Sequence, residues 1–232
     1  MSSYYCLVAG LPDVNLDDGK LNYTVENFKS ELYPELSRKD QLLIDLFYLK
    51  YDNADLLRLL KDKDAVVDGG GNFSSEELLA LITAVHEGET PDSRYPLYMY
   101  QFVEQYFMLQ PEEQYRADDL LAGLYYAYAM QCGNSFIASW FEFNLNVNNI
   151  LAALTARKYK MDVPSVVVGA TDVCAQLRTS NARDFGLTEQ ITYFEQIMRI
   201  SEIDELVERE KKIDLLKWNW LEDEVFFHYF TI

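Results

Sequence analysis

The sequence contains few of the residues that build metal centres, nucleophilic sites and disulfide frameworks. It has two histidines, His86 and His228, which lie far apart and without zinc-ligand spacing. The three cysteines, Cys6, Cys132 and Cys174, form no CxxC pair, and we expect them to be buried as small hydrophobic residues. GxSxG, HExxH and Walker motifs are also missing. We therefore expect no catalytic residues, no bound metal and no cofactor.

Long hydrophobic runs are missing as well. No segment reaches 18 uninterrupted apolar residues, the length that a membrane-spanning helix requires. The apolar run from Tyr4 to Leu11 is too short to span, and no Lys or Arg precedes Lys20, which argues against a signal peptide. We expect a cytoplasmic protein without direct lipid insertion, peripheral to a membrane only through a protein complex.

Basic residues are scarce relative to acidic ones. The 232 residues include 20 Lys and Arg against 38 Asp and Glu, which gives a net charge of −18. Such a surface repels phosphate backbones and anionic lipid headgroups, so nucleic-acid binding is not expected. Complementary charge favours a partner with basic patches, although an ordinary acidic surface accounts for the charge equally well.

Apolar residues recur at helical spacing along most of the chain, and strict alternation dominates nowhere. A short helix is expected over 24–33, where Pro34 stops it. Ser37 then caps a helix with a broad apolar face, which we expect to break near Asp52-Asn53. This pattern predicts an all-α fold built of helical bundles.

The middle of the chain carries clear helix boundaries. Ser74 and Glu77 have capping-box spacing, so a helix should begin there and end near Gly88. The long helical pattern that starts at Pro111 contains Cys132-Gly133-Asn134, which predicts a turn between two antiparallel helices. Residues 163–187 are less regular and fit either a short strand or a loop that crosses the core.

The last part of the chain predicts one long helix from Ser201 to about Tyr229. Its apolar residues recur every seven positions, which is typical of a seam against other helices. They are Leu206, Ile213, Trp220 and Phe227. The second half is apolar almost all round, so we expect it to be deeply packed.

Three consecutive glycines, Gly69–Gly71, indicate a flexible linker. The sequence is interpreted as a single helical domain over 1–232, with sub-units over 1–68, 74–162 and 163–232.

Three helical segments each carry Asp or Asn followed by two aliphatic residues. They are Asp55-Leu56-Leu57, Asn149-Ile150-Leu151 and Asp214-Leu215-Leu216. The pattern suggests a degenerate threefold repeat. Because such triplets are common in helices, chance recurrence is the alternative.

A family resemblance adds weight to the repeat. The segments YYCLVAGLPDVNLDDGK, FNLNVNNILAALTARKYKMDV and REKKIDLLKWNWLEDEVFFHYF resemble an uncharacterised bacterial family whose members are typically encoded beside V-type ATPase genes. Through its opening segment and the three triplets, the chain is similar, more distantly, to the central-stalk subunit, called C in A-type and d in eukaryotic enzymes. Those subunits are considerably longer and have more helices between repeats.

The resemblance implies a funnel of helices that binds the shaft and the membrane ring of a V-type ATPase and catalyses nothing. On this interpretation Asp55, Asn149 and Asp214 occupy corresponding repeat positions and cap or cross-link neighbouring helices. A freestanding helical adaptor or assembly factor of the same complex is the alternative. An enzyme is a third hypothesis, which would require a pocket with convergent titratable groups.

Overall fold

The computed structural model describes residues 4–12, 14, 23–90 and 92–228. All regular secondary structure in these residues is helical, which confirms the predicted all-α class. The chain divides into two compact units, Met1–Phe47 and Tyr48–Ile232, and the boundary falls inside helix α3 (Arg38–Lys61). Each unit is described by itself.

The first unit is made of short helical turns that lead into α3. It contains α1 (Tyr5–Ala9), α2 (Val25–Asn27), the π-helical turn η1 (Phe28–Leu32), the 3-10 turn η2 (Tyr33–Glu35) and the beginning of α3. Pro34 does not end the helical run that was predicted over 24–33. It lies within the 3-10 turn η2, which follows the π-helical turn η1 and leads to α3.

Two tyrosine hydroxyls fix these turns to the beginning of α3. Tyr4 donates a hydrogen bond to Asp40 (2.6 Å) and accepts one from the backbone N–H of Ser37 (2.8 Å). Tyr33 donates to Asp45 (2.5 Å), and burial together with this carboxylate raises the pKa of Tyr33 to about 12. Among the described residues of this unit, Leu32 and Leu46 are the apolar side chains that are buried, and polar contacts that span 12 to 36 residues supplement them.

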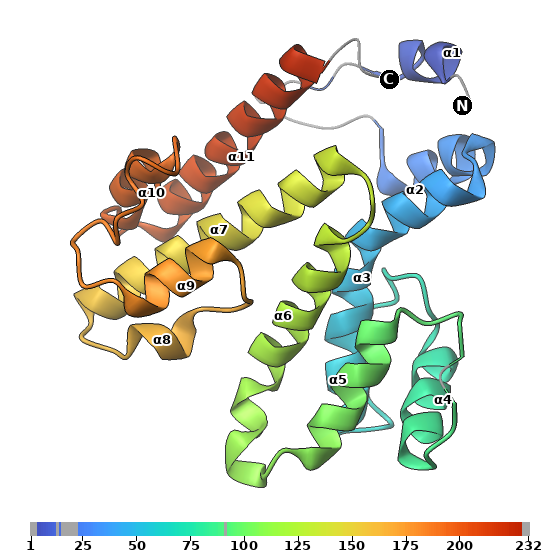
Figure 1. The fold of residues 1–232 in the computed structure, drawn as a ribbon. Coiled ribbons are helices and arrows are strands. Elements are labelled where there is room, and N and C mark those ends of the chain that lie inside the picture. The colour runs from blue at the N-terminus through green and yellow to red at the C-terminus, as the bar shows by residue number, and fades with distance from the viewer. Residues whose placement is uncertain (1–3, 13, 15–22, 91, 229–232) are drawn as a thin grey trace. The chain divides into compact units, whose positions relative to one another are not determined.

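The second unit contains the rest of α3 and the longer helices (Figure 1). These are α4 (Ser75–His86), α5 (Leu97–Met108), the 3-10 turn η3 (Pro111–Arg116), α6 (Ala117–Met130), α7 (Ser135–Lys158), α8 (Val163–Val166), α9 (Asp172–Thr179), α10 (Phe194–Ser201) and α11 (Leu206–His228). Helix α6 packs between α5 and α7, and α7 also packs against α8, α9 and α10.

The predicted helix boundaries in the middle of the chain are confirmed. Ser74 and Glu77 form a reciprocal capping box at the start of α4, and Gly88 follows its end with φ +71°. Gly133 (φ +77°) and the N-cap Asn134 form the predicted turn between α6 and α7. Glycine is required at both turns because a Cβ disfavours positive φ.

Other predicted boundaries are wrong. Helix α3 continues through Asp52 and Asn53 without a break, because both side chains are buried and hydrogen-bonded. Ser201 ends α10 and does not begin the last helix, which starts at Leu206. In 163–187 the structure has the helices α8 and α9 in place of a strand.

The last helix is less deeply packed than its composition predicts. Ile213 is buried, but Leu206 is 63% exposed, and Val225 and Phe226 are 57% and 78% exposed. The predicted end at Tyr229 lies outside the described residues. Packing of α11 therefore depends on its middle, where the Trp220 ring stacks on another aromatic ring at a centroid distance of 5.0 Å.

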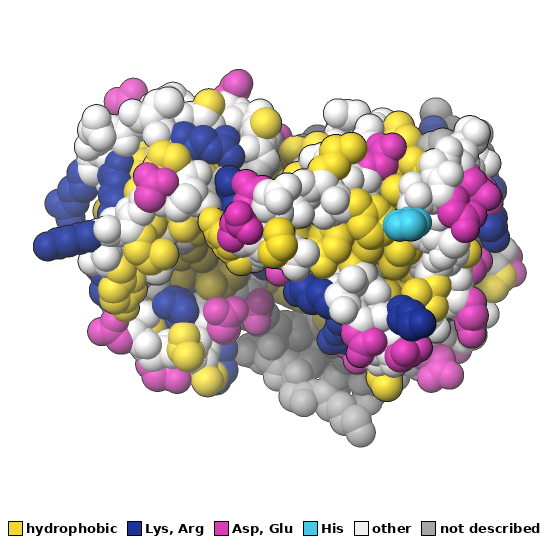
Figure 2. Space-filling view, turned by 90° about the horizontal axis from the view of Figure 1, so that it is seen from below, with side chains coloured by type: hydrophobic (Ala, Val, Ile, Leu, Met, Phe, Trp, Pro, Cys, Tyr) yellow, Lys and Arg dark blue, Asp and Glu magenta, His cyan; other side chains and the backbone are white. Residues whose placement is uncertain are grey.

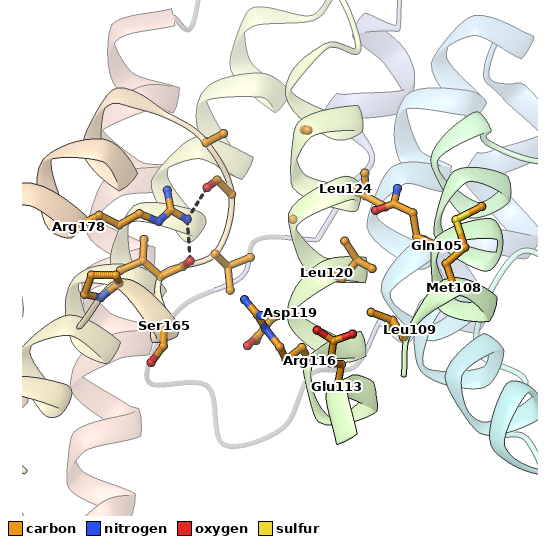
Figure 3. Close-up of a pocket in the computed structure, with 17 residues that line it drawn as sticks. Gln105, Met108, Leu109, Glu113, Arg116, Asp119, Leu120, Leu124, Ser165 and Arg178 are labelled. Atoms are coloured by element: carbon orange, nitrogen blue, oxygen red, sulfur yellow. Dashed lines mark hydrogen bonds between the residues drawn. The ribbon is translucent and has the colours of Figure 1, made fainter. Parts of the chain in front are cut away.

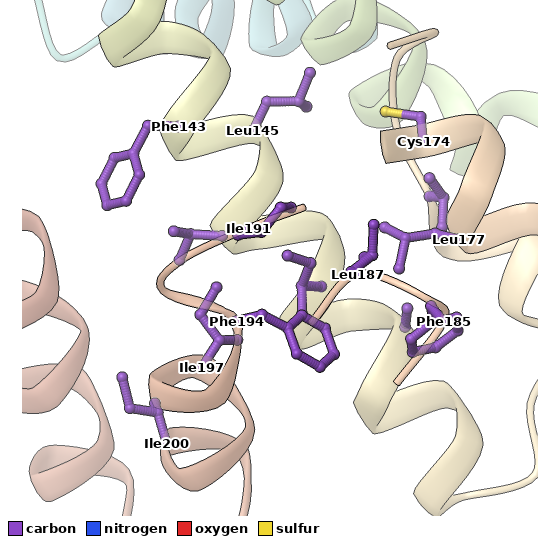
Figure 4. Packing of buried hydrophobic residues seen from close by; sticks show 14 of the residues in the cluster. Phe143, Leu145, Cys174, Leu177, Phe185, Leu187, Ile191, Phe194, Ile197 and Ile200 are labelled. Atoms are coloured by element: carbon purple, nitrogen blue, oxygen red, sulfur yellow. The ribbon is translucent and has the colours of Figure 1, made fainter. Parts of the chain in front are cut away.

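The second unit has apolar cores on both sides of α6 and α7. One contains buried residues of α3 to α6, including Leu56, Leu78 and Phe102. The other lies between α7 and the segments that follow it (Figure 4). Its large members come from α7, α9, α10 and the loop between the last two: Phe143, Leu145, Ile150, Leu177, Phe185, Leu187, Ile191, Phe194 and Ile197.

Candidate functional site

Two buried aspartates of α3 hold the glycine-rich connection between α3 and α4 (62–74). Asp52 accepts hydrogen bonds from the backbone N–H groups of Asn72 (2.8 Å) and Phe73 (2.9 Å). Asp55 accepts from those of Asp68 (3.2 Å) and Gly69 (3.3 Å). Carboxylates suit this role because they accept several hydrogen bonds and donate none.

The glycines allow this connection to approach the helix closely. A Cβ on Gly71 would lie 2.0 Å from Oδ1 of Asp52, so only glycine fits at this position. Gly69 has a φ of +66°, which also favours glycine. The run Gly69–Gly71, predicted as a flexible linker and as a sub-unit boundary, thus lies inside the second unit with its flanking backbone bound to α3.

Asn149 of α7 holds the next connection, between α7 and α9 (159–171), in a related way. Its Oδ1 accepts from the backbone N–H of Val168 (2.8 Å), and its Nδ2 donates to the carbonyl oxygen of the same residue (2.7 Å). Nδ2 also lies 3.3 Å from Sγ of Cys174. One side-chain amide therefore binds both polar groups of a single backbone residue.

The two anchored segments match in several further respects. Both α3 and α7 are 24 residues long, and each has a second buried Asx three residues before the first, Asp52 and Asn146. The N-cap of α4, Ser74, follows the end of α3 by 13 residues, and the N-cap of α9, Thr171, follows the end of α7 by the same number, with the short helix α8 in between.

The third triplet differs. Asp214 lies on α11, which is 23 residues long, but its side chain is exposed. In the part of the chain that the structure describes, no connection comparable to 62–74 or 159–171 follows α11. The structure thus brings Asp55 and Asn149 into similar surroundings and places Asp214 on the surface.

A cleft of about 740 Å³ runs along one face of α6 (Figure 3). One wall comes from the end of α5, η3 and α6, and the other from the α7–α9 connection and Arg178. The α6 residues that line it recur at helical spacing, whereas Leu121 and Tyr125 point to the opposite, buried side.

Arg178 stiffens the second wall. Its Nη2 donates to the carbonyl oxygens of Val167 and Gly169, each at 2.7 Å. Gly123 of α6 lies beside this segment, since a Cβ there would be 3.6 Å from the backbone nitrogen of Gly169. The α7–α9 connection, which forms this wall, is thus bound by Asn149 at Val168 and by Arg178 at Val167 and Gly169.

Asp119 is the carboxylate at the centre of the cleft (Figure 3). Partial burial raises its pKa above the usual value for aspartate, and the neighbouring Asp118 raises it further. Arg116 lowers it by a smaller amount. The cleft therefore contains a carboxylate that a cation from outside would stabilise in its ionised form.

Tyrosine hydroxyls are buried beside the first anchor. Tyr98 donates a hydrogen bond of 2.7 Å to Oδ1 of Asn53, and its ring lies 5.9 Å from that of Tyr125. Burial raises the pKa of both phenols well above the usual value. The tyrosines of this region contribute mainly to the core.

The sequence analysis missed Asp52, Arg178 and the cleft. Asp52 lies three positions before Asp55, so the two side chains share a helix face, and this spacing could have indicated that they act together. Nothing in the local sequence indicated that Arg178 would bind the backbone near Val168. The described residues contain no cluster of three or more His, Cys, Asp or Glu suited to a metal and no helix long and apolar enough to cross a membrane.

The comparisons identify a family. A family model described as a protein of unknown function (DUF2764) matches residues 1–232, so the chain belongs to this uncharacterised family. Neither a curated protein nor a solved structure matches the chain.

Proposed function

We propose that this member of the DUF2764 family is a non-catalytic subunit of a V-type ATPase, of the central-stalk or rotor type. In this role it couples the shaft to the membrane ring by binding other subunits. The observation that carries the proposal is the recurrence of one anchoring arrangement, in which Asp55 and Asn149 each hold the connection that follows a 24-residue helix.

The anchoring suits a protein that transmits force. A connection bound to its helix through buried hydrogen bonds can move only if those bonds break, and unpaired buried polar groups cost about 1–3 kcal/mol each. Asp52 and Asp55 supply such bonds for one connection, and Asn149 and Arg178 for the other. Two long helices with fixed connections resist bending, as a coupling element must.

The second candidate is a freestanding helical adaptor or assembly factor of the same complex. The position of Asp214 favours it, because this side chain is exposed, whereas Asp55 and Asn149 are buried and hydrogen-bonded to a connection.

The experiment is an affinity purification of the tagged full-length protein from its native cells, at low and at moderate salt. Cells that carry the tag alone are the control, and the co-purifying chains are identified and quantified. Recovery of head and ring subunits of a V-type ATPase in a fixed ratio, with about one complex for each tagged chain, supports the stalk role, and substoichiometric recovery of the complex supports the assembly factor. Recovery of neither, at low salt, would overturn both.

A further inference from the structure

We propose that the cleft along α6 is the docking site for a basic amphipathic helix of a partner protein. This inference rests on the proposed function in one respect, namely that the protein works by binding other proteins. It adds the site and the chemistry of the partner.

The shape of the cleft fits a helix. The residues of α6 that line it extend from Asp119 to Ala127, with Glu113 and Arg116 of η3 before them, so the cleft runs along about 12 Å of the α6 axis, which is about two turns. The lining residues of α6 recur at intervals of three and four, which is the ridge-and-groove pattern into which another helix packs. Gly123 lies where the two walls meet, beside Gly169, and the small, exposed side chain of Ala127 leaves room for a helix at the end of this surface.

The apolar character of the lining fits the inner face of such a helix. Leu120 and Leu124 lie half-buried in the cleft, and Met108 at the end of α5 is 76% exposed. Figure 2, which views the molecule from below, shows hydrophobic side chains exposed in patches, with both acidic and basic side chains near them. Apolar residues at i, i+3, i+4 and i+7 are the anchors that a helix offers to a groove.

The charge around the cleft selects a basic partner. The first wall, 105–127, has four Asp and Glu against one Arg, a net charge of −3, and that Arg116 itself lines the cleft. On the second wall, Arg178 is already bound to two backbone carbonyls, Asp162 lies within the connection, and Asp172 follows it directly. Lys and Arg at the edges of a docked helix would meet these carboxylates, among them the partly buried Asp119.

The same charge argues against a second copy of this chain as the occupant. Two copies would each carry a net charge of −18, and like charges that meet across an interface weaken it. In 105–127 and in 162–178 acidic residues outnumber basic ones, so two copies that met through this face would bring like charges together.

The test uses a synthetic helical peptide of about 14 residues, with Leu at i, i+3, i+4 and i+7 and Lys or Arg elsewhere. A peptide with Glu in place of Lys and Arg and a scrambled basic peptide are the control probes. Affinity for the full-length protein is measured by fluorescence anisotropy. We expect the basic peptide to bind, the acidic one not to bind, and the scrambled one to bind at least about tenfold more weakly. Equal binding of the basic and scrambled peptides would overturn the proposal.

Two matched pairs of variants locate the binding. Asp119→Arg lines the cleft and Asp118→Arg does not, although both make the same change in net charge. We expect Asp119→Arg to weaken peptide binding by about tenfold and Asp118→Arg by less than about threefold. Met108→Gln should weaken binding by several-fold, whereas Met161→Gln, an exposed methionine outside the cleft, should not.

Equal effects within either pair would mean general surface attraction and would overturn the site. Circular dichroism and thermal unfolding verify that each variant is folded. Concentration-dependent self-association that Asp119→Arg strengthens would also contradict the proposal, because it would indicate a second copy in the cleft.

The affinity purification separates this proposal from the function on which it rests. If V-type ATPase subunits co-purify with the wild type and equally with Asp119→Arg, the docking site is wrong and the function stands. If the peptide results are as expected but no such subunits are recovered, the function is wrong and the docking site stands.

Discussion

Asp55 and Asn149 bind the connection that follows their own helix, but with different hydrogen-bonding chemistry. Asp55 accepts two backbone N–H groups, whereas Asn149 accepts one N–H and donates to one carbonyl. The peptide orientation of each connection determines which side chain fits. A carboxylate suits two N–H groups that point at the helix, and an amide suits a residue that presents both of its backbone groups.

The exchange of these two side chains should therefore have unequal effects. Asn149→Asp loses the donor to Val168 and buries a charge beside a carbonyl oxygen, so we expect a loss of about 3 kcal/mol in the free energy of unfolding. Asp55→Asn keeps one oxygen that can accept from Asp68 but turns a donor towards the N–H of Gly69, whose hydrogen bond of 3.3 Å is long, so its loss should be smaller, about 1–2 kcal/mol. Urea unfolding at neutral pH measures both, and equal losses would contradict this account.

Gly71 and Gly70 form a matched pair. Gly71→Ala would place a Cβ 2.0 Å from Asp52, whereas Gly70→Ala would meet the Tyr51 ring at an ordinary 3.4 Å. We expect Gly71→Ala to lower the free energy of unfolding by about 2 kcal/mol or more, and Gly70→Ala to change it by less than about 1 kcal/mol.

A double variant tests the cause at Gly71. Because the clash is with the Asp52 side chain, Asp52→Ala combined with Gly71→Ala should be less destabilised than the sum of the two single losses. Additive losses would show that the Ala side chain at position 71 clashes with something else.

The buried phenols predict sensitivity to alkaline pH. The folded-state pKa of Tyr98 and of Tyr125 is raised by burial, while the unfolded-state value is about 10. The stabilising contribution of the neutral phenols is complete below about pH 10 and is lost as the pH rises from there towards the folded-state values. Thermal unfolding from pH 8 to pH 11, read with tyrosinate absorbance, measures the loss.

Tyr125→Phe is the control for this pH dependence, because it removes one ionisable phenol with no polar group added. In this variant the melting temperature should decrease less steeply above pH 10 than in the wild type. An unchanged slope would assign the alkaline transition to other groups.

Arginine and lysine should differ in their effect on stability at position 157, where Arg157 binds the loop between α9 and α10. Its guanidinium donates to the backbone carbonyls of Ser180, Ala182 and Arg183 and lies 3.4 Å from the centroid of the Phe185 ring. Lysine cannot reproduce this fork, so Arg157→Lys should lower the free energy of unfolding by about 1–3 kcal/mol.

Arg183→Lys is the matched control, because this side chain is exposed and its backbone carbonyl, which Arg157 uses, is unchanged. We expect a change below about 0.5 kcal/mol. A similar loss in both variants would mean that the loop responds to charge and not to the geometry of the guanidinium.

The elements that could be predicted from the sequence depend on short-range chemistry. The capping box at Ser74 and the turn at Gly133 involve residues a few positions apart, so both can be recognised in the sequence alone. The continuity of α3 through Asp52 could not be predicted, because the hydrogen bonds that satisfy this carboxylate come from residues about 20 positions later.

The cleft depends on still longer-range relationships. Its walls come from 105–127 and from 164–178, and they meet where Gly123 approaches Gly169. The sequence shows Asp119 as one of several acidic residues, and only the fold places it between the two walls. The boundary between α10 and α11 was also missed, since Ser201 resembles an N-cap although it ends a helix.

The unlike anchors of the two long helices also bear on how the chain folds. Similar segments in one chain risk exchange, in which a helix captures the connection that belongs to the other. If α7 captured 68–73, the amide of Asn149 would meet N–H groups with its own donor, and if α3 captured 167–169, Asp55 would face a carbonyl oxygen. Each mispairing would leave a buried repulsion, so the difference between one carboxylate and one amide favours the correct assembly of two otherwise interchangeable parts.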